Sequence, residues 1–220
     1  MPDYETLRMD ERLELQHAAA RLRDEFKGVF GAETIQRFLT SSYNEFAPRA
    51  RLKKFLGLFA ERFARQRLTA LARVEGHRSP DEPPILLFLC VHNAGRSQIA
   101  LGWTQYLAGK RAIAWSGGMD PAEEQNPTVV EAMAEIGIDI SSEFPKPWTD
   151  EVVRAADVIV TMGCGDACPI YPGKDYQDWD IPDLVGLSLE EMRPIRDDLG
   201  RRVRGLLENL HVLAETPARA

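Results

Sequence analysis

Apolar residues in the first 75 positions repeat with the spacing of an α-helix in three successive segments. Five apolar residues occupy positions i, i+3, i+4, i+7 and i+11 of the first segment: Leu15, Ala18, Ala19, Leu22 and Phe26. The same spacing recurs from Ile35 to Phe46 and from Leu52 to Phe63. Gly28, Gly31 and Pro48 interrupt the pattern between the segments. We therefore expect an all-α three-helix bundle over residues 1–76.

Such a short bundle can bury only a thin core. Its third helix is rich in aromatic residues and has an apolar face larger than two partner helices need. We expect this surplus face to pack against a second copy of the chain, which would make residues 1–76 a dimerisation domain and the protein a homodimer.

The pattern changes after a polar, proline-containing linker at residues 77–84. Residues 85–220 alternate between short apolar runs and amphipathic segments. The expected strands are "PILLFLC", "RAIAWSGG" and "AADVIVTMG"; the expected helices are "SQIALGWTQYLAG", "NPTVVEAMAEIG" and the long closing segment from Ser188. Strands that alternate with helices predict an α/β domain, in which a parallel sheet carries helices on both faces.

Charge supports the division into two domains. The net charge is −7, yet residues 1–80 contain 15 basic and 11 acidic residues, which leaves 12 basic and 23 acidic residues for the rest. The basic first part leaves a nucleic-acid-binding regulator as an alternative, but no DNA-reading element is evident, and we expect no nucleic-acid partner.

No apolar run is long enough to span a membrane, and the N-terminus is charged where a signal peptide is apolar. We expect a cytoplasmic protein.

The strongest chemical motif is "CVHNAGRS" at residues 90–97, which follows the first buried strand and opens a helix. Successive backbone N–H groups in such a loop, together with the N-terminus of the helix, form a cradle for an oxyanion. Arg96 supplies a planar fork for two oxygens, and Gly95 allows the turn. Cys90 would face this cradle as a thiolate nucleophile, with Ser97 as its hydrogen-bond donor. The oxyanion-binding residues are Val91, His92, Asn93, Ala94, Gly95, Arg96 and Ser97. The alternative is that Cys90 is only a small buried apolar residue.

Two further cysteines, Cys164 and Cys168, follow the third strand and would lie at the same sheet edge. In a helical turn their sulfurs could approach disulfide distance. A structural zinc site needs about four ligands, and the four histidines have no matching spacing, so we expect no metal. Two inert thiols remain the other alternative.

The segment "FLCVHNAGRSQIA" resembles the active-site loop of arsenate reductases related to low-molecular-weight protein tyrosine phosphatases, and "HNAGRSQ" is typical of the reductases. The similarity continues through "SGG", "NPTVVEAMAEIGIDIS", "ADVIVTMGCGDACPIYPGKDYQDWDIPD" and "RPIRDDL", over about residues 84 to 210. It implies a flavodoxin-like sheet and arsenate as the substrate, with phosphate or sulfate as mimics. The helical bundle resembles one attached to some actinobacterial members.

The resemblance also implies roles for the three cysteines. Cys90 would form a thiol-arsenate adduct, Cys164 would attack Cys90 and release arsenite, and Cys168 would resolve that disulfide for reduction by thioredoxin. No bound cofactor is expected. Only three residues separate Cys164 from Cys168, fewer than in the well-known thioredoxin-linked type. Mycothiol with a mycoredoxin, using mainly Cys90, is therefore the alternative reductant.

In the family, an aspartate followed by proline protonates the leaving oxygen. Asp183 matches that aspartate, but Leu184 follows it, and Asp180 is a local competitor. By the same resemblance, Asn93 shapes the cradle, while Ser116 and Gly117 pack beneath it. A tyrosine phosphatase of the same fold is the main competing function, although "WDIPDLVG" lacks the tyrosines that flank the aspartate in those enzymes.

Overall fold

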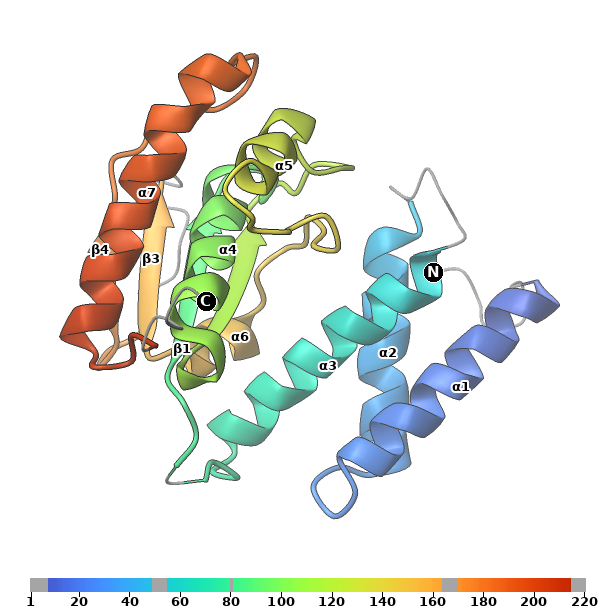
Figure 1. Ribbon diagram of the computed structural model, residues 1–220. Helices are drawn as coiled ribbons and strands as arrows, with labels where there is room; N and C mark the ends of the chain where they lie inside the picture. Colours follow the sequence, from blue (N-terminus) through green and yellow to red (C-terminus); the bar gives the residue numbers. More distant parts are fainter. Residues whose placement is uncertain (1–7, 49–54, 80, 164–169, 215–220) are drawn as a thin grey trace, which may run out of the picture. The chain divides into compact units, whose positions relative to one another are not determined.

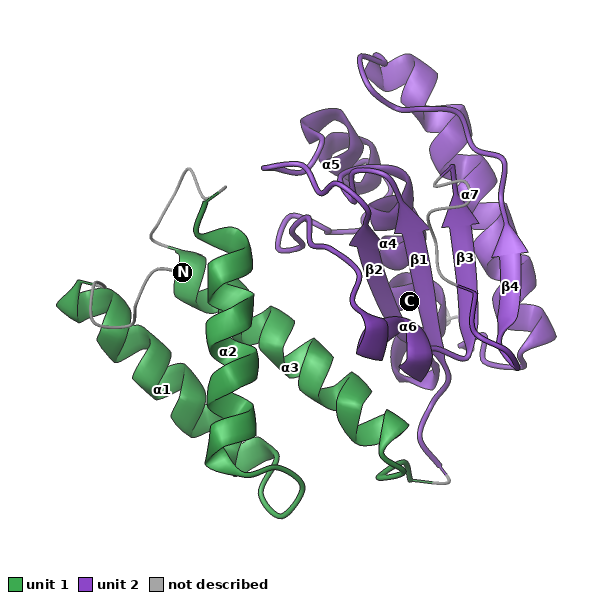
Figure 2. Cartoon of the chain, turned by 180° about the vertical axis from the view of Figure 1, so that it is seen from behind, with its two compact units in different colours: residues 1–79 green, residues 80–220 purple. Residues whose placement is uncertain are grey.

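The computed structural model describes residues 8–48, 55–79, 81–163 and 170–214. The chain divides into two compact units, Met1–Ser79 and Pro80–Ala220, which Figure 2 shows in different colours. Within the described part of the chain, no helix is sufficiently long and apolar to cross a membrane.

The first unit consists of helices α1 (Met9–Glu25), α2 (Ala32–Phe46) and α3 (Leu56–Val74). Their buried faces are those that the apolar spacing predicts. Leu15, Leu22, Ile35, Leu39, Phe63 and Leu68 are almost completely buried. The third helix begins at Leu56; Leu52, which the sequence pattern places in it, lies outside the described residues.

One buried carboxylate ties α1 to α3. Glu61 accepts hydrogen bonds from Arg21 on α1, with an Nε to Oε1 distance of 2.9 Å, and from Arg65 one turn further along α3, at 2.9 Å. Arg65 also bonds Glu25 at 2.7 Å. Burial alone would raise the pKa of Glu61, but the two arginines lower it below its usual value. The bundle therefore contains an ionised group that depends on its arginine partners.

The second unit contains a four-stranded parallel sheet with the order β2-β1-β3-β4. The strands are β1 (Ile85–Cys90), β2 (Ile113–Gly118), β3 (Val158–Met162) and β4 (Asp175–Asp178). All six residues of the central strand β1 are buried, as its continuous apolar run predicts. Cys90 pairs with Gly118 on one side and with Met162 on the other, so three strands end together at one edge.

The described residues of this unit also form α4 (Arg96–Ala108), the 3₁₀ turn η3 (Gly109–Arg111), α5 (Pro127–Ala134), α6 (Asp150–Ala155) and α7 (Leu189–Asn209). Helices α4, α5 and α7 pack together on one face of the sheet, and α6 lies on the other face (Figures 1 and 2). The parallel sheet with helices on both faces, preceded by a helical unit, confirms the predicted fold class.

Local sequence explains where two of these helices begin. The Asn126 side chain accepts the Thr128 N–H at 3.0 Å, and Pro127 occupies the first turn of α5. Helix α7 begins with a capping box in which Ser188 and Glu191 bond each other's backbone N–H. Both caps lie next to loops that reach the carboxyl edge of the sheet.

Candidate active site

The Cys90 sulfur is held by two hydrogen-bond contacts at the end of β1. The side chain is only 3% exposed. The Asn93 backbone N–H donates to Sγ at 3.2 Å, and the Ser97 hydroxyl lies 3.0 Å from Sγ. Asn93 Nδ2 already donates to Ser97 Oγ at 2.8 Å, which leaves the Ser97 hydroxyl proton free to point at the sulfur. The sulfur thus has a polar partner on two sides, the Asn93 N–H and the Ser97 hydroxyl.

The loop after Cys90 turns its carbonyl groups outward. The carbonyl oxygens of Cys90, Val91, His92 and Ala94 accept backbone N–H groups of residues 119–126, at 2.9 to 3.3 Å. The Asn93 carbonyl accepts Gln98 Nε2 at 2.9 Å. Because these carbonyls are engaged on the outer side, the loop presents its N–H groups to the concave side, next to the N-terminus of α4. This arrangement can bind a tetrahedral oxyanion.

Asn93 holds the loop in this shape. Its φ of 48° is in the left-handed region, which asparagine tolerates better than most residues. Its side-chain oxygen accepts the Lys146 backbone N–H at 2.9 Å and Gln98 Nε2 at 3.3 Å. One buried side chain thus connects the loop, α4 and the segment after α5.

Gly118, opposite Cys90 in the sheet, lies directly against the loop. A Cβ atom at this position would lie 2.7 Å from the Val91 carbonyl oxygen and 2.9 Å from the Asn93 nitrogen. Only glycine allows this approach of the two backbones.

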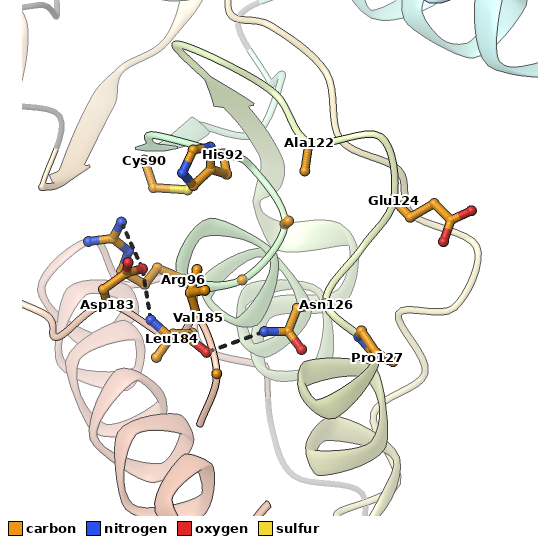
Figure 3. A pocket seen from close by; sticks show the side chains of 13 residues that line it. Cys90, His92, Arg96, Ala122, Glu124, Asn126, Pro127, Asp183, Leu184 and Val185 are labelled. Carbon is orange, nitrogen blue, oxygen red and sulfur yellow. Dashed lines mark hydrogen bonds and ion pairs between the residues drawn. The ribbon is translucent and has the colours of Figure 1, made fainter. Parts of the chain in front are cut away.

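The cradle opens into a pocket of about 330 Å³ (Figure 3). The lining residues come from the loop, from the segment before α5 and from the segment before α7: Cys90, His92, Ala94, Gly95, Arg96, Ala122, Glu124, Asn126, Pro127, Asp183, Leu184, Val185 and Gly186. The structure therefore brings Cys90, Arg96 and Asp183, three residues singled out from sequence, to one pocket.

The Arg96 side chain is almost buried. Its Nη1 donates to the Ile181 carbonyl at 3.4 Å, and its Nη2 lies 3.7 Å from Asp183 Oδ1. A Cβ atom on Gly163 would lie 2.6 Å from Arg96 Nη1, and Gly163 has a φ of 74°. Gly163, just after β3, therefore leaves the space that the Arg96 guanidinium occupies beside the segment before α7.

Asp183 lies at the mouth of the pocket with its side chain 64% exposed. Its Oδ1 accepts the backbone N–H of Leu184 at 2.8 Å. Leu184 itself is buried and packs against Gly95 in the loop. Asp180, the competing aspartate, is exposed, and its neighbour Trp179 packs against Phe88 with a ring-centroid distance of 6.2 Å.

Cys164 and Cys168 lie outside the described residues. The expected relay among the three cysteines therefore stays a prediction. Among the residues that the structure describes, no group of three or more histidine, cysteine, aspartate or glutamate side chains could hold a metal ion.

Lys146 is a site residue that the sequence reasoning missed. Its side chain is almost fully buried, and its Nζ donates to the Phe144 carbonyl at 3.3 Å and to Ser116 Oγ at 3.4 Å. Glu143 lies 3.7 Å away. The Lys146 backbone N–H bonds Asn93, so a buried cation supports the segment that holds the cradle. A single lysine between two prolines gave no recognisable pattern.

Comparison with known proteins identifies relatives of both units. Residues 15–72 match the protein-tyrosine-phosphatase-like N-terminal domain, and residues 85–215 match the low molecular weight phosphotyrosine protein phosphatase family. The structure of the Corynebacterium glutamicum thioredoxin-dependent arsenate reductase is similar over 90% of this chain and 96% of that chain, with a TM-score of 0.80 and 44% identity.

Two curated relatives match the second unit. A putative arsenate reductase of Halobacterium salinarum is 33% identical over 56% of this chain and 91% of its own length. The arsenate reductase of Bacillus subtilis is 34% identical over 58% of this chain and 97% of its own length. Because the family model matches residues 85–215, the chain belongs to the low molecular weight phosphotyrosine protein phosphatase family, and arsenate reductases are among its relatives.

Proposed function

We propose that the protein reduces arsenate to arsenite, with Cys90 as the nucleophile. The observation that carries this proposal is the sulfur of Cys90, held by the Asn93 N–H and the Ser97 hydroxyl at the base of an oxyanion cradle. Relatives that share this domain are named arsenate reductases, which supports arsenate as the oxyanion.

In the first step the Cys90 thiolate forms a sulfur–arsenic bond with arsenate, and one arsenic–oxygen bond breaks. The departing hydroxyl of arsenate takes one further proton from Asp183, the acid that the family resemblance assigns and that lines the same pocket, and leaves as water, while arsenic stays in its pentavalent state. The cradle amides and Arg96 bind the oxygens that carry the negative charge of this step. The pocket-lining residues His92, Ala94 and Gly95 surround the same space.

Reduction follows when a second thiol attacks Cys90. A disulfide forms, the sulfur–arsenic bond breaks, and its electron pair reduces arsenic to the trivalent state, so arsenite leaves. We assign Cys164 as this second thiol and Cys168 as the resolving thiol, on the family resemblance. An external dithiol then reduces the final disulfide. Thioredoxin is the reductant that we propose, because the similar Corynebacterium protein is named thioredoxin-dependent.

The proposal is tested by measuring arsenite release with purified thioredoxin, thioredoxin reductase and NADPH. We expect turnover by the wild type, none by Cys90→Ser, and at most one turnover by Cys164→Ser and Cys168→Ser. Full turnover by both distal variants would eliminate the three-thiol relay. Turnover only with mycothiol and mycoredoxin would identify that pair as the reductant.

A phosphatase is the second candidate, because phosphate and arsenate have similar tetrahedral shapes and the family includes phosphatases. Tyrosine is absent from the thirteen residues that line the described pocket. An aromatic phosphoester would thus lack the ring contacts that a tyrosine provides. Hydrolysis of phosphotyrosine peptides faster than arsenate reduction would favour the phosphatase.

We further propose that the first unit forms a homodimer. Met9 and Leu13 on α1 and Leu58 on α3 are exposed apolar side chains, from 46% to 70% exposed. Exposed apolar side chains on a small helical unit favour contact with a second copy. Light scattering at micromolar concentration should give twice the chain mass, and Leu13→Glu with Leu58→Glu should lower it to one chain. A monomeric wild type would contradict the proposal.

A further inference from the structure

The two strands beside β1 each end at or just before a glycine. On one side Cys90 pairs with Gly118, the last residue of β2. On the other side it pairs with Met162, the last residue of β3, and Gly163 follows directly. Gly118 leaves room for the backbone of the cradle, whereas Gly163 leaves room for a side chain, the guanidinium of Arg96. The arginine of the oxyanion site therefore rests against a residue outside the cradle.

The polar contacts of Arg96 hold its guanidinium only loosely. Among the residues that the structure describes, its partners are the Ile181 carbonyl, 3.4 Å from Nη1, and Asp183 Oδ1, 3.7 Å from Nη2 (Figure 3). Both distances exceed the about 2.7–2.9 Å of a close charge-assisted hydrogen bond. Yet the side chain is only 10% exposed. The guanidinium is thus positioned mainly by the walls around it, and most of its five N–H donors remain for an oxyanion.

Gly163 forms one of these walls. A Cβ atom at this position would lie 2.6 Å from Arg96 Nη1, 3.5 Å from Cζ and 3.9 Å from Nη2. Ordinary van der Waals contact begins at 3.4 Å, so Nη1 would have to retreat by about 0.8 Å. Cζ and Nη2 already lie at ordinary contact distances. Only one arm of the guanidinium collides, and relieving the collision changes the direction in which the planar fork points.

The effect of such a collision falls on binding more than on folding. Nη1 is the end of a flexible side chain, so an added Cβ displaces the guanidinium more easily than it would displace backbone. A planar fork contacts two oxygens of one anion only when it is correctly oriented. A misplacement of about 1 Å at a reacting site is enough to cost about 100-fold in rate.

We propose that Gly163 is a positioning residue of the oxyanion site: because it has no side chain, the fork of Arg96 can lie where it contacts two oxygens of a tetrahedral oxyanion. This inference rests on the proposed function in one respect, that the ligand of the cradle is such an anion. It adds the end of β3 to the parts of the chain that determine how tightly the anion binds.

The test measures the dissociation constant of inorganic phosphate by isothermal titration calorimetry. Gly163→Ala is compared with Gly137→Ala, because the two glycines have similar positive φ angles, 74° and 77°, and alanine strains the backbone at both. Nothing lies within 4 Å of a Cβ at Gly137. We expect the dissociation constant of Gly163→Ala to exceed that of Gly137→Ala by about 10- to 100-fold, the effect of losing one hydrogen bond to a charged group.

A second background shows whether Gly163 acts through the fork. Arg96→Lys replaces the fork by one ammonium group, which has a single terminal nitrogen. In the Arg96→Lys protein, Gly163→Ala should change the dissociation constant of phosphate by less than about twofold. Equal constants for Gly163→Ala and Gly137→Ala, or the same loss in both backgrounds, would overturn the proposal.

A crystal structure of the wild-type protein with phosphate decides the matter if Gly163→Ala does not fold. Arg96 Nη1 should bond a phosphate oxygen while it stays closer than 3.4 Å to the position of a Cβ at Gly163. A guanidinium that leaves Gly163 to reach the phosphate would refute the role of this glycine.

Arsenite release, measured on the same variants, separates this proposal from the proposed function. Phosphate binding that follows the expected pattern, without arsenite release by the wild type, would refute the proposed function alone. Arsenite release by the wild type, together with an unchanged phosphate affinity in Gly163→Ala, would refute only the role of Gly163.

Discussion

Removing the Ser97 hydroxyl tests whether the sulfur of Cys90 is held as a thiolate. Ser97 Oγ lies 3.0 Å from Sγ and accepts Asn93 Nδ2, which leaves the Ser97 hydroxyl proton available to the sulfur. A hydrogen bond to a charged group contributes about 1.5–3 kcal/mol. Since about 1.4 kcal/mol is a factor of ten, Ser97→Ala should slow alkylation of Cys90 at neutral pH by about 10- to 100-fold.

The assay is the rate of reaction with iodoacetamide, followed by mass spectrometry in a background where Cys164 and Cys168 are serine. Thr104→Val is the matched control. Thr104 carries a buried hydroxyl on the same helix, and that hydroxyl donates to the Ala100 carbonyl at 2.8 Å. The control should alkylate at the wild-type rate. If Ser97→Ala reacts as fast as the control, the hydroxyl does not stabilise the thiolate and the argument fails.

Three further changes probe the cradle and the helical unit. Lys146→Met removes a buried ammonium and should lower the free energy of unfolding, measured by urea titration, by about 1–3 kcal/mol. The control Lys110→Met replaces an exposed lysine and should leave the free energy of unfolding almost unchanged. Gly118→Ala forces a Cβ against the cradle backbone and should cut arsenite release at least about tenfold, whereas Gly31→Ala, where nothing lies within 4 Å, should retain it. Because the pKa of Glu61 is lowered in the folded chain, the ionised carboxylate contributes its full stabilisation of the helical unit above about pH 4.5, and this contribution is lost as the pH falls through the folded pKa. Acid unfolding followed by circular dichroism should therefore show a smaller loss of stability in Glu61→Gln than in the wild type.

Sequence periodicity predicted the elements whose burial is strong. The six buried residues of β1 form an uninterrupted apolar run, and the three helices of the first unit carry clear apolar stripes. The polar edge strand β4, with the sequence "DYQD", and the six-residue helix α6 were missed. An edge strand buries little and a short helix has few turns, so neither leaves a periodic signal.

The same limit applies to the site. Cys90 and Arg96 could be predicted because the cradle is a continuous stretch of chain with a recognisable spacing. Lys146 and Gly163 come from distant segments and act as single residues. Their importance depends on what lies next to them, the Asn93 side chain and the Arg96 guanidinium, which only the folded chain determines.

The central position of β1 constrains when the surroundings of Cys90 can be completed during synthesis. Leu87 pairs with Trp115 on one side and with Ile159 on the other, so the strand gains its second neighbour only after more than half of this unit has been made. Pairings between segments so distant along the chain form late, after local helices. A ribosome-bound chain that ends before β3 would therefore carry Cys90 on a strand that still lacks its Met162 neighbour, so one side of the sheet edge beside the sulfur stays open until β3 is made.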